Sequence, residues 1–169
     1  MPAMLNPRKA DIDALVTAAL ACFPIPLEGL VVNAEPHPHN PDELDVVAKL
    51  FDCDDVPCLL EELEKCASRR SPFKLEASSA PGARVLSGRA FAREYERPDH
   101  RTLFLMIPLI SRGGNTGLLV VQHEEATRGS GMATDHWILM NKGANGQWSR
   151  CPVPQILKDQ LFLTEETGG

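Results

Sequence analysis

The change in hydrophobic spacing near residue 78 is the feature that most limits how this chain can fold. Before it, apolar residues recur at intervals of three and four, which is the spacing along one side of an α-helix. After it, apolar residues alternate with polar ones or form short runs between Gly-rich turns, which is typical of β-strands. Helices that precede strands predict an α+β domain, with N-terminal helices packed on one face of a curved antiparallel sheet.

Three helices are expected in the first part of the chain. The first has Asn6 as its N-cap and ends at Pro24, and its apolar side consists of Ile12, Leu15, Val16, Ala19, Leu20 and Phe23. A proline-rich linker over 34–41 leads to a second helix at 41–51, which Asn40 caps. A third helix is expected to start at Asp54 or Asp55 and to end near residue 67.

The strands are expected at 102–110, 118–123, 136–141 and 147–151, and the last of them form an antiparallel meander. Pro108 implies a sheet edge or a bulge, because proline cannot donate to a strand ladder. Segment 88–97 has no wide apolar stripe, so it is also predicted to be a strand. Its alternation would place one set of side chains on one face: Arg89, Phe91, Arg93, Tyr95 and Arg97.

The whole arrangement predicts one domain over residues 1–163, with a helical part at about 7–70 and a sheet at about 82–151. Residues 164–169 are expected to form a loose tail. This order of elements is similar to the cystatin-like and nuclear-transport-factor-like plans. The resemblance is one of element order alone and implies no function.

Both tryptophans of the chain flank its one Asn-Gly dipeptide, in the stretch 135–148. Asn145-Gly146 is the residue pair that a tight turn between two strands favours. A structural hairpin is therefore the preferred interpretation. The alternative is a ligand cavity lined by the two tryptophans.

Catalytic motifs are lacking: the sequence has no nucleophile elbow, no phosphate-binding glycine loop and no CxxC pair. We therefore expect no catalytic residue, no cofactor and no metal. The alternative is a pocket under the helices, formed by His123, His136 and Trp137. There, two histidines and a carboxylate of 123–125 would hold a metal or run proton transfer. An ordinary solvated strand end explains the same histidines. The arginine-aromatic face of 88–97 suggests anion contact, or simply a half-exposed strand.

Negative charge is concentrated in residues 40–64, where nine Asp and Glu accompany a single Lys. The chain as a whole carries a net charge of −6, so this segment accounts for more than the whole excess. Such a field attracts basic partners and repels nucleic acids and membrane surfaces. The residues expected to bind a partner are Asp42, Asp45, Asp52, Asp54, Asp55, Glu61, Glu62 and Glu64. A solvated helix face is the alternative.

These features favour a non-enzymatic cytoplasmic protein that binds another, basic protein. Its most concrete form is an immunity or inhibitor protein that neutralises a toxin or enzyme. A small-molecule pocket or an enzyme is the second hypothesis, and a secretion chaperone or adaptor is the third. Asp11 and Asp13 argue against a signal peptide in 14–23, because they lie where such a peptide is basic or apolar.

Overall fold

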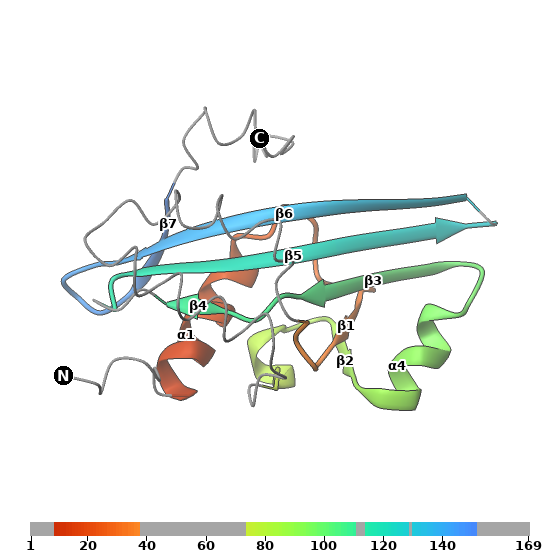
Figure 1. The fold of residues 1–169 in the computed structure, drawn as a ribbon, viewed down its shortest axis with the longest axis horizontal. Coiled ribbons are helices and arrows are strands. Elements are labelled where there is room, and N and C mark those ends of the chain that lie inside the picture. The colour runs from red at the N-terminus through yellow and green to blue at the C-terminus, as the bar shows by residue number, and fades with distance from the viewer. Residues whose placement is uncertain (1–8, 38–73, 111–113, 129, 152–169) are drawn as a thin grey trace.

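The computed structural model describes residues 9–37, 74–110, 114–128 and 130–151 (Figure 1). The predicted helices at 41–51 and 54–67 and the predicted tail lie outside these residues. In the described part, α-helices and one 3-10 turn accompany a curved, mostly antiparallel sheet of seven strands. The predicted α+β class is therefore confirmed.

Helix α1, Lys9–Ala21, has the predicted apolar side. Its residues Leu15, Val16, Ala19 and Leu20 are buried, and Phe23 continues the same buried surface just after the helix ends. The helix lies across one face of the sheet, where its side chains cluster with Leu103, Leu119, Val121, Ile138 and Met140. The three- and four-residue spacing thus predicted both the helix and the side that it buries.

The sheet has the strand order β2-β1-β3-β5-β6-β7, and β4 pairs with β5 beyond the end of β3 (Figure 1). These strands are β1 (Val31–Asn33), β2 (Arg84–Leu86), β3 (His100–Leu105), β4 (Leu109–Ile110), β5 (Thr116–Thr127), β6 (Ser130–Lys142) and β7 (Trp148–Cys151). The long β5–β6 hairpin runs from the Thr116–Asn141 pair to the Thr127–Ser130 pair.

Two features of the sheet differ from the expected antiparallel arrangement. Strand β1 pairs in parallel with both β2 and β3, so the sheet is mixed on this side. The expected strand 102–110 is divided into β3 and β4, and Pro108 lies in the gap between them. The missing N–H of Pro108 explains the interruption of the ladder, as the sequence indicated.

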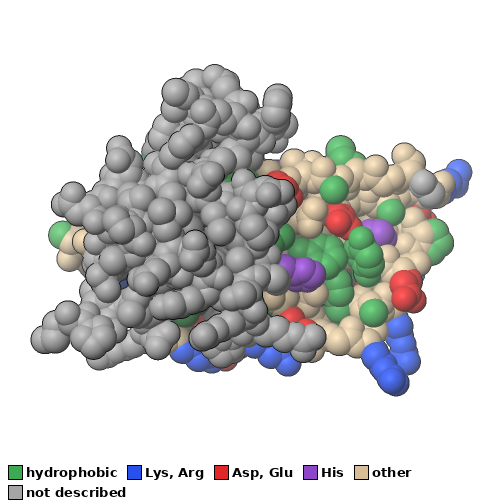
Figure 2. Space-filling view, viewed as in Figure 1, with side chains coloured by type: hydrophobic (Ala, Val, Ile, Leu, Met, Phe, Trp, Pro, Cys, Tyr) green, Lys and Arg blue, Asp and Glu red, His purple; other side chains and the backbone are tan. Residues whose placement is uncertain are grey.

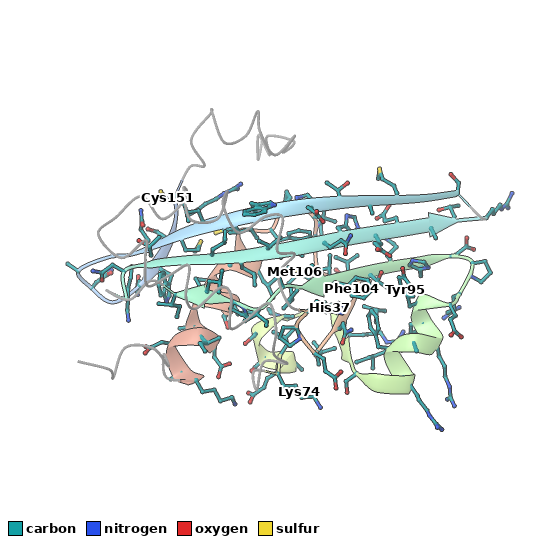
Figure 3. The ribbon with its side chains drawn as sticks, in the orientation of Figure 1. His37, Lys74, Tyr95, Phe104, Met106 and Cys151 are labelled. Atoms are coloured by element: carbon teal, nitrogen blue, oxygen red, sulfur yellow. The ribbon has the colours of Figure 1, made fainter. Side chains whose placement is uncertain are left out.

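The prediction of a strand at 88–97 is wrong, because Gly88–Tyr95 forms helix α4. Two apolar residues one turn apart are enough to hold this short helix on the sheet. The rings of Phe91 and Tyr95 lie 5.1 Å and 5.3 Å from the ring of Phe104 on β3. Figure 3 shows Tyr95, Phe104 and His37 together on this side of the sheet.

The helical conformation also removes the proposed arginine-aromatic face. Helical periodicity turns Arg89 and Arg93 away from the side on which Phe91 and Tyr95 contact the sheet. The apolar side of this helix consists of Phe91 and Tyr95 only, which is too narrow to predict a helix from hydrophobic spacing. Phe91 is buried and the arginines on the same helix are exposed.

The hairpin predicted at 135–148 is confirmed. Lys142 at the end of β6 pairs with Trp148 at the start of β7, and Gly146 has a φ of 79° in the turn between them. The side-chain Oδ1 of Asn145 accepts a hydrogen bond from the backbone N–H of Gln147 at 3.0 Å. Trp148 packs against the core under α1, whereas Trp137 lies on the other face of the sheet. The two tryptophans therefore do not line a common cavity.

Candidate functional site

The sheet brings His123 and His136 together beneath the end of α1. His136 pairs with Val121 across the β5–β6 hairpin, and His123 lies two residues further along β5 on the same face. The ring centroids of the two histidines are 6.3 Å apart. The ring of Phe23 covers both, at 6.2 Å from His123 and 5.0 Å from His136.

Both histidines are nearly inaccessible to solvent. His123 is 4% exposed and His136 is 8% exposed, and buried aliphatic residues, Leu103 and Val121, lie opposite them in the sheet. Polar side chains rarely occupy such positions without a compensating partner. The histidine pair is therefore the most unusual polar feature of the buried face in the described part of the chain.

An ion pair between the neighbouring strands β3 and β5 lies next to this histidine pair. The Nε of Arg101 donates to Oε1 of Glu125 at 2.9 Å, and these two residues face each other directly across β3 and β5. Nε2 of His123 lies 3.2 Å from the same Oε1. The latter contact lacks hydrogen-bond alignment and is an electrostatic contact only.

The pKa values of Glu125 and His123 are both lower than usual, so at neutral pH the first group is charged and the second is not. The hydrogen bond from Arg101 lowers the pKa of Glu125, so this group is a carboxylate at neutral pH. Burial lowers the pKa of His123, and the attraction of Glu125 offsets this effect only in part. At neutral pH the imidazole of His123 is therefore an uncharged base beside a carboxylate, and it could accept a proton.

Metal binding has less support from this geometry. Among the described residues, no group of three His, Cys, Asp or Glu side chains is arranged to hold a metal ion. The chemistry that the arrangement of His123, His136 and Glu125 offers is proton transfer or hydrogen bonding at a buried imidazole pair.

The predicted pocket residues are only partly brought together. His123 and His136 lie on the face under α1, but Trp137 follows His136 directly and therefore projects from the opposite face. Trp137 is 6% exposed on that face, where it lies opposite Val120 of β5. The eight predicted partner-binding residues lie outside the described residues: Asp42, Asp45, Asp52, Asp54, Asp55, Glu61, Glu62 and Glu64.

Phe23 and Arg101 belong to this site, although the sequence reasoning did not assign them to it. Phe23 was expected to be a core residue of the first helix, and nothing in its spacing indicated histidines beneath it. Arg101 reaches Glu125 through the β3–β5 pairing, across 24 positions in the sequence. This contact depends on the register between β3 and β5, which the local spacing of apolar residues does not specify.

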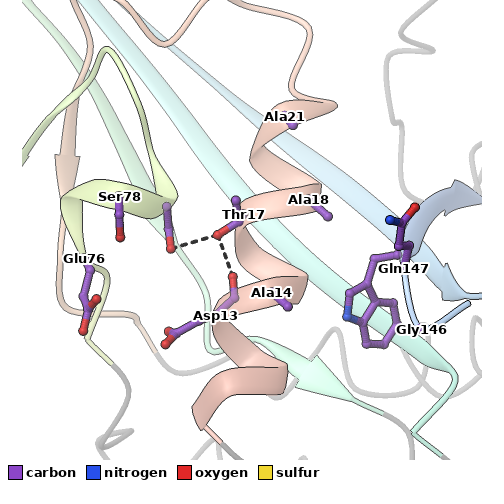
Figure 4. Close-up of a pocket in the computed structure, with 11 residues that line it drawn as sticks. Asp13, Ala14, Thr17, Ala18, Ala21, Glu76, Ser78, Gly146 and Gln147 are labelled. Carbon is purple, nitrogen blue, oxygen red and sulfur yellow. Dashed lines mark hydrogen bonds between the residues drawn. The ribbon is translucent and has the colours of Figure 1, made fainter.

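A separate cavity of about 570 Å³ lies beside α1, between the helix, residues 76–79 and the β6–β7 turn (Figure 4). On its wall, Thr17 Oγ1 is hydrogen-bonded to the carbonyl oxygen of Asp13 at 2.7 Å and to Ser79 Oγ at 2.9 Å. Its two carboxylates already share a cation, since Nζ of Lys9 lies 2.6 Å from Glu76 and 3.8 Å from Asp13. Lys9 therefore offsets one of these two negative charges, and no other charged side chain is among the described residues that line the cavity.

None of the described helices has the length and apolar character that a membrane crossing requires. Comparison of the chain with models of protein families, with curated proteins and with solved structures found no match.

Proposed function

We propose that this protein is a non-enzymatic cytoplasmic binding protein that recognises a basic protein through its acidic segment, residues 40–64. The most concrete form is an immunity or inhibitor protein that neutralises a toxin or enzyme. The observation that carries the proposal is the separation of charge along the chain. The described residues contain ten Lys and Arg and eleven Asp and Glu, whereas residues 40–64 alone have a net charge of −8.

The ion pairs of the described residues support the view that the excess negative charge lies in residues 40–64. Five of their eleven carboxylates lie within 4.0 Å of a Lys or Arg: Asp11, Asp13, Glu76, Glu94 and Glu125. The described residues thus carry nearly equal numbers of acidic and basic side chains, and ion pairs neutralise at least five of the acids. The excess negative charge belongs to the acidic segment, where the sequence supplies one lysine.

Uncompensated like charge within one segment opposes compactness, and a cationic partner surface would relieve that repulsion. Complementary potentials would also accelerate encounter with such a partner, most strongly at low ionic strength. A solvated surface needs no such concentration of a single sign of charge. Partner binding accounts for both the amount and the position of the acidic residues.

The test begins with capture of partners by the immobilised full-length protein from extracts of its native cell. The affinity of each recovered basic protein is then measured with purified components. Reversal of Asp54, Asp55 and Glu61 to lysine should weaken binding by about two orders of magnitude, and by more at low salt. Reversal of three exposed acids of the described framework, Glu28, Glu35 and Glu96, is the charge-matched control and should have a small effect.

Equal loss of affinity in both triple variants would mean that net charge, not this segment, drives the interaction. Unchanged affinity in the first variant would overturn the proposal. An activity assay on the recovered partner separates the forms of binding. Inhibition supports an immunity or inhibitor protein, whereas an active and better-folded partner supports a secretion chaperone or adaptor.

A buried small-molecule or catalytic site is the second candidate, and the convergence of His123 and His136 under Phe23 favours it. A thermal-shift screen against metal ions and metabolites tests this function directly. A stabilising ligand whose effect disappears in His136→Ala supports the pocket. Failure of every ligand, or a shift that persists in that variant, removes it.

A further inference from the structure

A cavity of about 530 Å³ opens at the end of the sheet where β2, β3 and the tip of the β5–β6 hairpin meet. Four arginines from four different parts of the chain line it: Arg84, Arg97, Arg101 and Arg128. Two carboxylates, Glu94 and Asp99, also line it. Figure 2 shows basic side chains at the margins of this region, along α4 and at the hairpin tip.

The positive charge of this cavity is not a general property of the molecule. The whole chain has a net charge of −6. Even when Glu125, the partner of Arg101, is counted with the two lining carboxylates, the four guanidinium groups leave one positive charge in excess. A local cationic surface on an acidic protein selects anionic ligands.

Ion pairs hold three of the arginines in fixed positions around the cavity. Glu94 bridges two of them, with Arg84 Nη2 at 3.2 Å from one carboxylate oxygen and Arg97 Nη1 at 3.3 Å from the other. Glu125 holds Arg101 through Nε, a contact that does not involve the two terminal NH₂ groups of that guanidinium. Arginines that are already positioned lose less conformational entropy when a ligand binds.

Arg128 provides an independent observation. It occupies the two-residue connection between Thr127 and Ser130 with a φ of 50°, and it is the only non-glycine residue with positive φ in the described part of the chain. Such turns favour Asn, Asp or Gly, because a bulky L side chain is strained in this conformation. Its backbone N–H donates to Oδ1 of Asp99 at 3.1 Å, which fixes the hairpin tip beside the cavity.

We propose that this cavity binds a small molecule through phosphate or carboxylate groups. Planar guanidinium groups match the oxygens of both kinds of anion, often through two parallel hydrogen bonds. The cavity volume is within the range of small-molecule sites. Binding of an anionic ligand by the guanidinium group explains why position 128 is an arginine, although the turn by itself favours Asn, Asp or Gly. None of the residues named in the lining of the cavity belongs to 40–64, so a variant of the cavity leaves the acidic segment unchanged and tests this proposal by itself.

The test is calorimetric titration of the full chain with pyrophosphate and, separately, with citrate at low ionic strength. Arg128→Gly should weaken binding roughly tenfold or more, because a charged hydrogen-bond donor is lost. The same substitution relieves the positive φ, so its melting temperature should equal or exceed that of the wild type. Arg89→Gln, on the exposed side of α4 and outside the cavity, is the charge-matched control and should bind like the wild type.

The two probes identify the ligand class. Binding of pyrophosphate alone indicates a phosphate ligand, binding of citrate alone indicates a carboxylate ligand, and binding of both supports a general oxyanion site. The proposal is overturned if neither probe binds, if Arg128→Gly binds as well as the wild type, or if Arg89→Gln loses as much affinity. In those cases the arginines serve only in ion pairs of the fold.

Discussion

A β-carbon on Gly117 would lie 2.6 Å from Cδ1 of Leu15, because α1 crosses β5 where the strand has no side chain. Cδ2 of the same leucine would lie 2.8 Å away, and Cζ3 of Trp148 would lie 3.2 Å away. Leu15 is completely buried, so it has little freedom to move aside. Gly117 thus sets how closely α1 approaches the sheet that carries the histidine pair.

Gly117→Ala should lower the free energy of unfolding by about 1–3 kcal/mol, as for other overpacked cores. Urea denaturation measures this change. Gly131→Ala on β6 is the control, because its added β-carbon would have Glu125 O at an ordinary distance of 3.8 Å. It should alter stability by no more than about 0.5 kcal/mol.

The double variant Leu15→Ala, Gly117→Ala tests whether steric overlap with Leu15 causes this loss of stability. Leu15→Ala alone should cost about 2–5 kcal/mol, since it empties a buried site. The added methyl group then has room. The double variant should therefore lose less unfolding free energy than the two single variants lose together. Strict additivity would show that the two residues do not compete for the same space.

Stability should fall on mild acidification because of His123. Burial lowers the pKa of His123 in the folded state below its ordinary value of 6.5. As the pH falls through about 6.5, the unfolded chain therefore takes up this proton first, and the folded state loses stability until its own lowered pKa is reached. His123→Gln should reduce the difference in unfolding free energy between about pH 7.5 and about pH 5.5.

His100→Gln is the control for the loss of a histidine, because this residue lies at the half-exposed start of β3. His123→Gln should change the pH dependence of stability more than this control does. If His123→Gln shows the wild-type pH dependence, the buried imidazole does not contribute to acid sensitivity.

Of the two aromatic residues that hold helix α4 on the sheet, the buried Phe91 should contribute more to its stability than the exposed Tyr95. Phe91 is 5% exposed and contacts the ring of Phe104, so Phe91→Ala should cost about 3 kcal/mol through the lost ring contacts and the resulting cavity. Amide hydrogen exchange should then accelerate most strongly in residues 88–96. Arg89→Ala removes an exposed side chain from the same helix and should leave exchange nearly unchanged.

The β6–β7 turn should tolerate asparagine better than alanine at position 146. Gly146 has a φ of 79°, and a β-carbon added there would meet no atom within 4 Å, so the backbone conformation alone decides the outcome. Gly146→Ala should destabilise by about 1 kcal/mol, whereas Gly146→Asn should cost less, because asparagine enters this region more readily. Equal melting temperatures for the two variants would contradict this reason.

The sequence alone determined the elements whose signals are local. The three- and four-residue spacing of α1, the interruption at Pro108 and the Asn145-Gly146 turn all depend on residues a few positions apart. Each signal arises from backbone geometry or from a single apolar side, so no distant part of the chain is needed to interpret it. The concentration of acidic residues in 40–64 is likewise visible in the sequence alone.

Tertiary structure decided the features that join distant segments. Helix α4 depends on Phe104 of β3, the parallel position of β1 depends on pairing with β2 and β3, and the histidine site joins Phe23 to the β5–β6 hairpin. The cationic cavity likewise gathers arginines from positions 84 to 128. Strand register and helix packing fix these neighbours, and both depend on the free energy of the whole fold, which local periodicity does not contain.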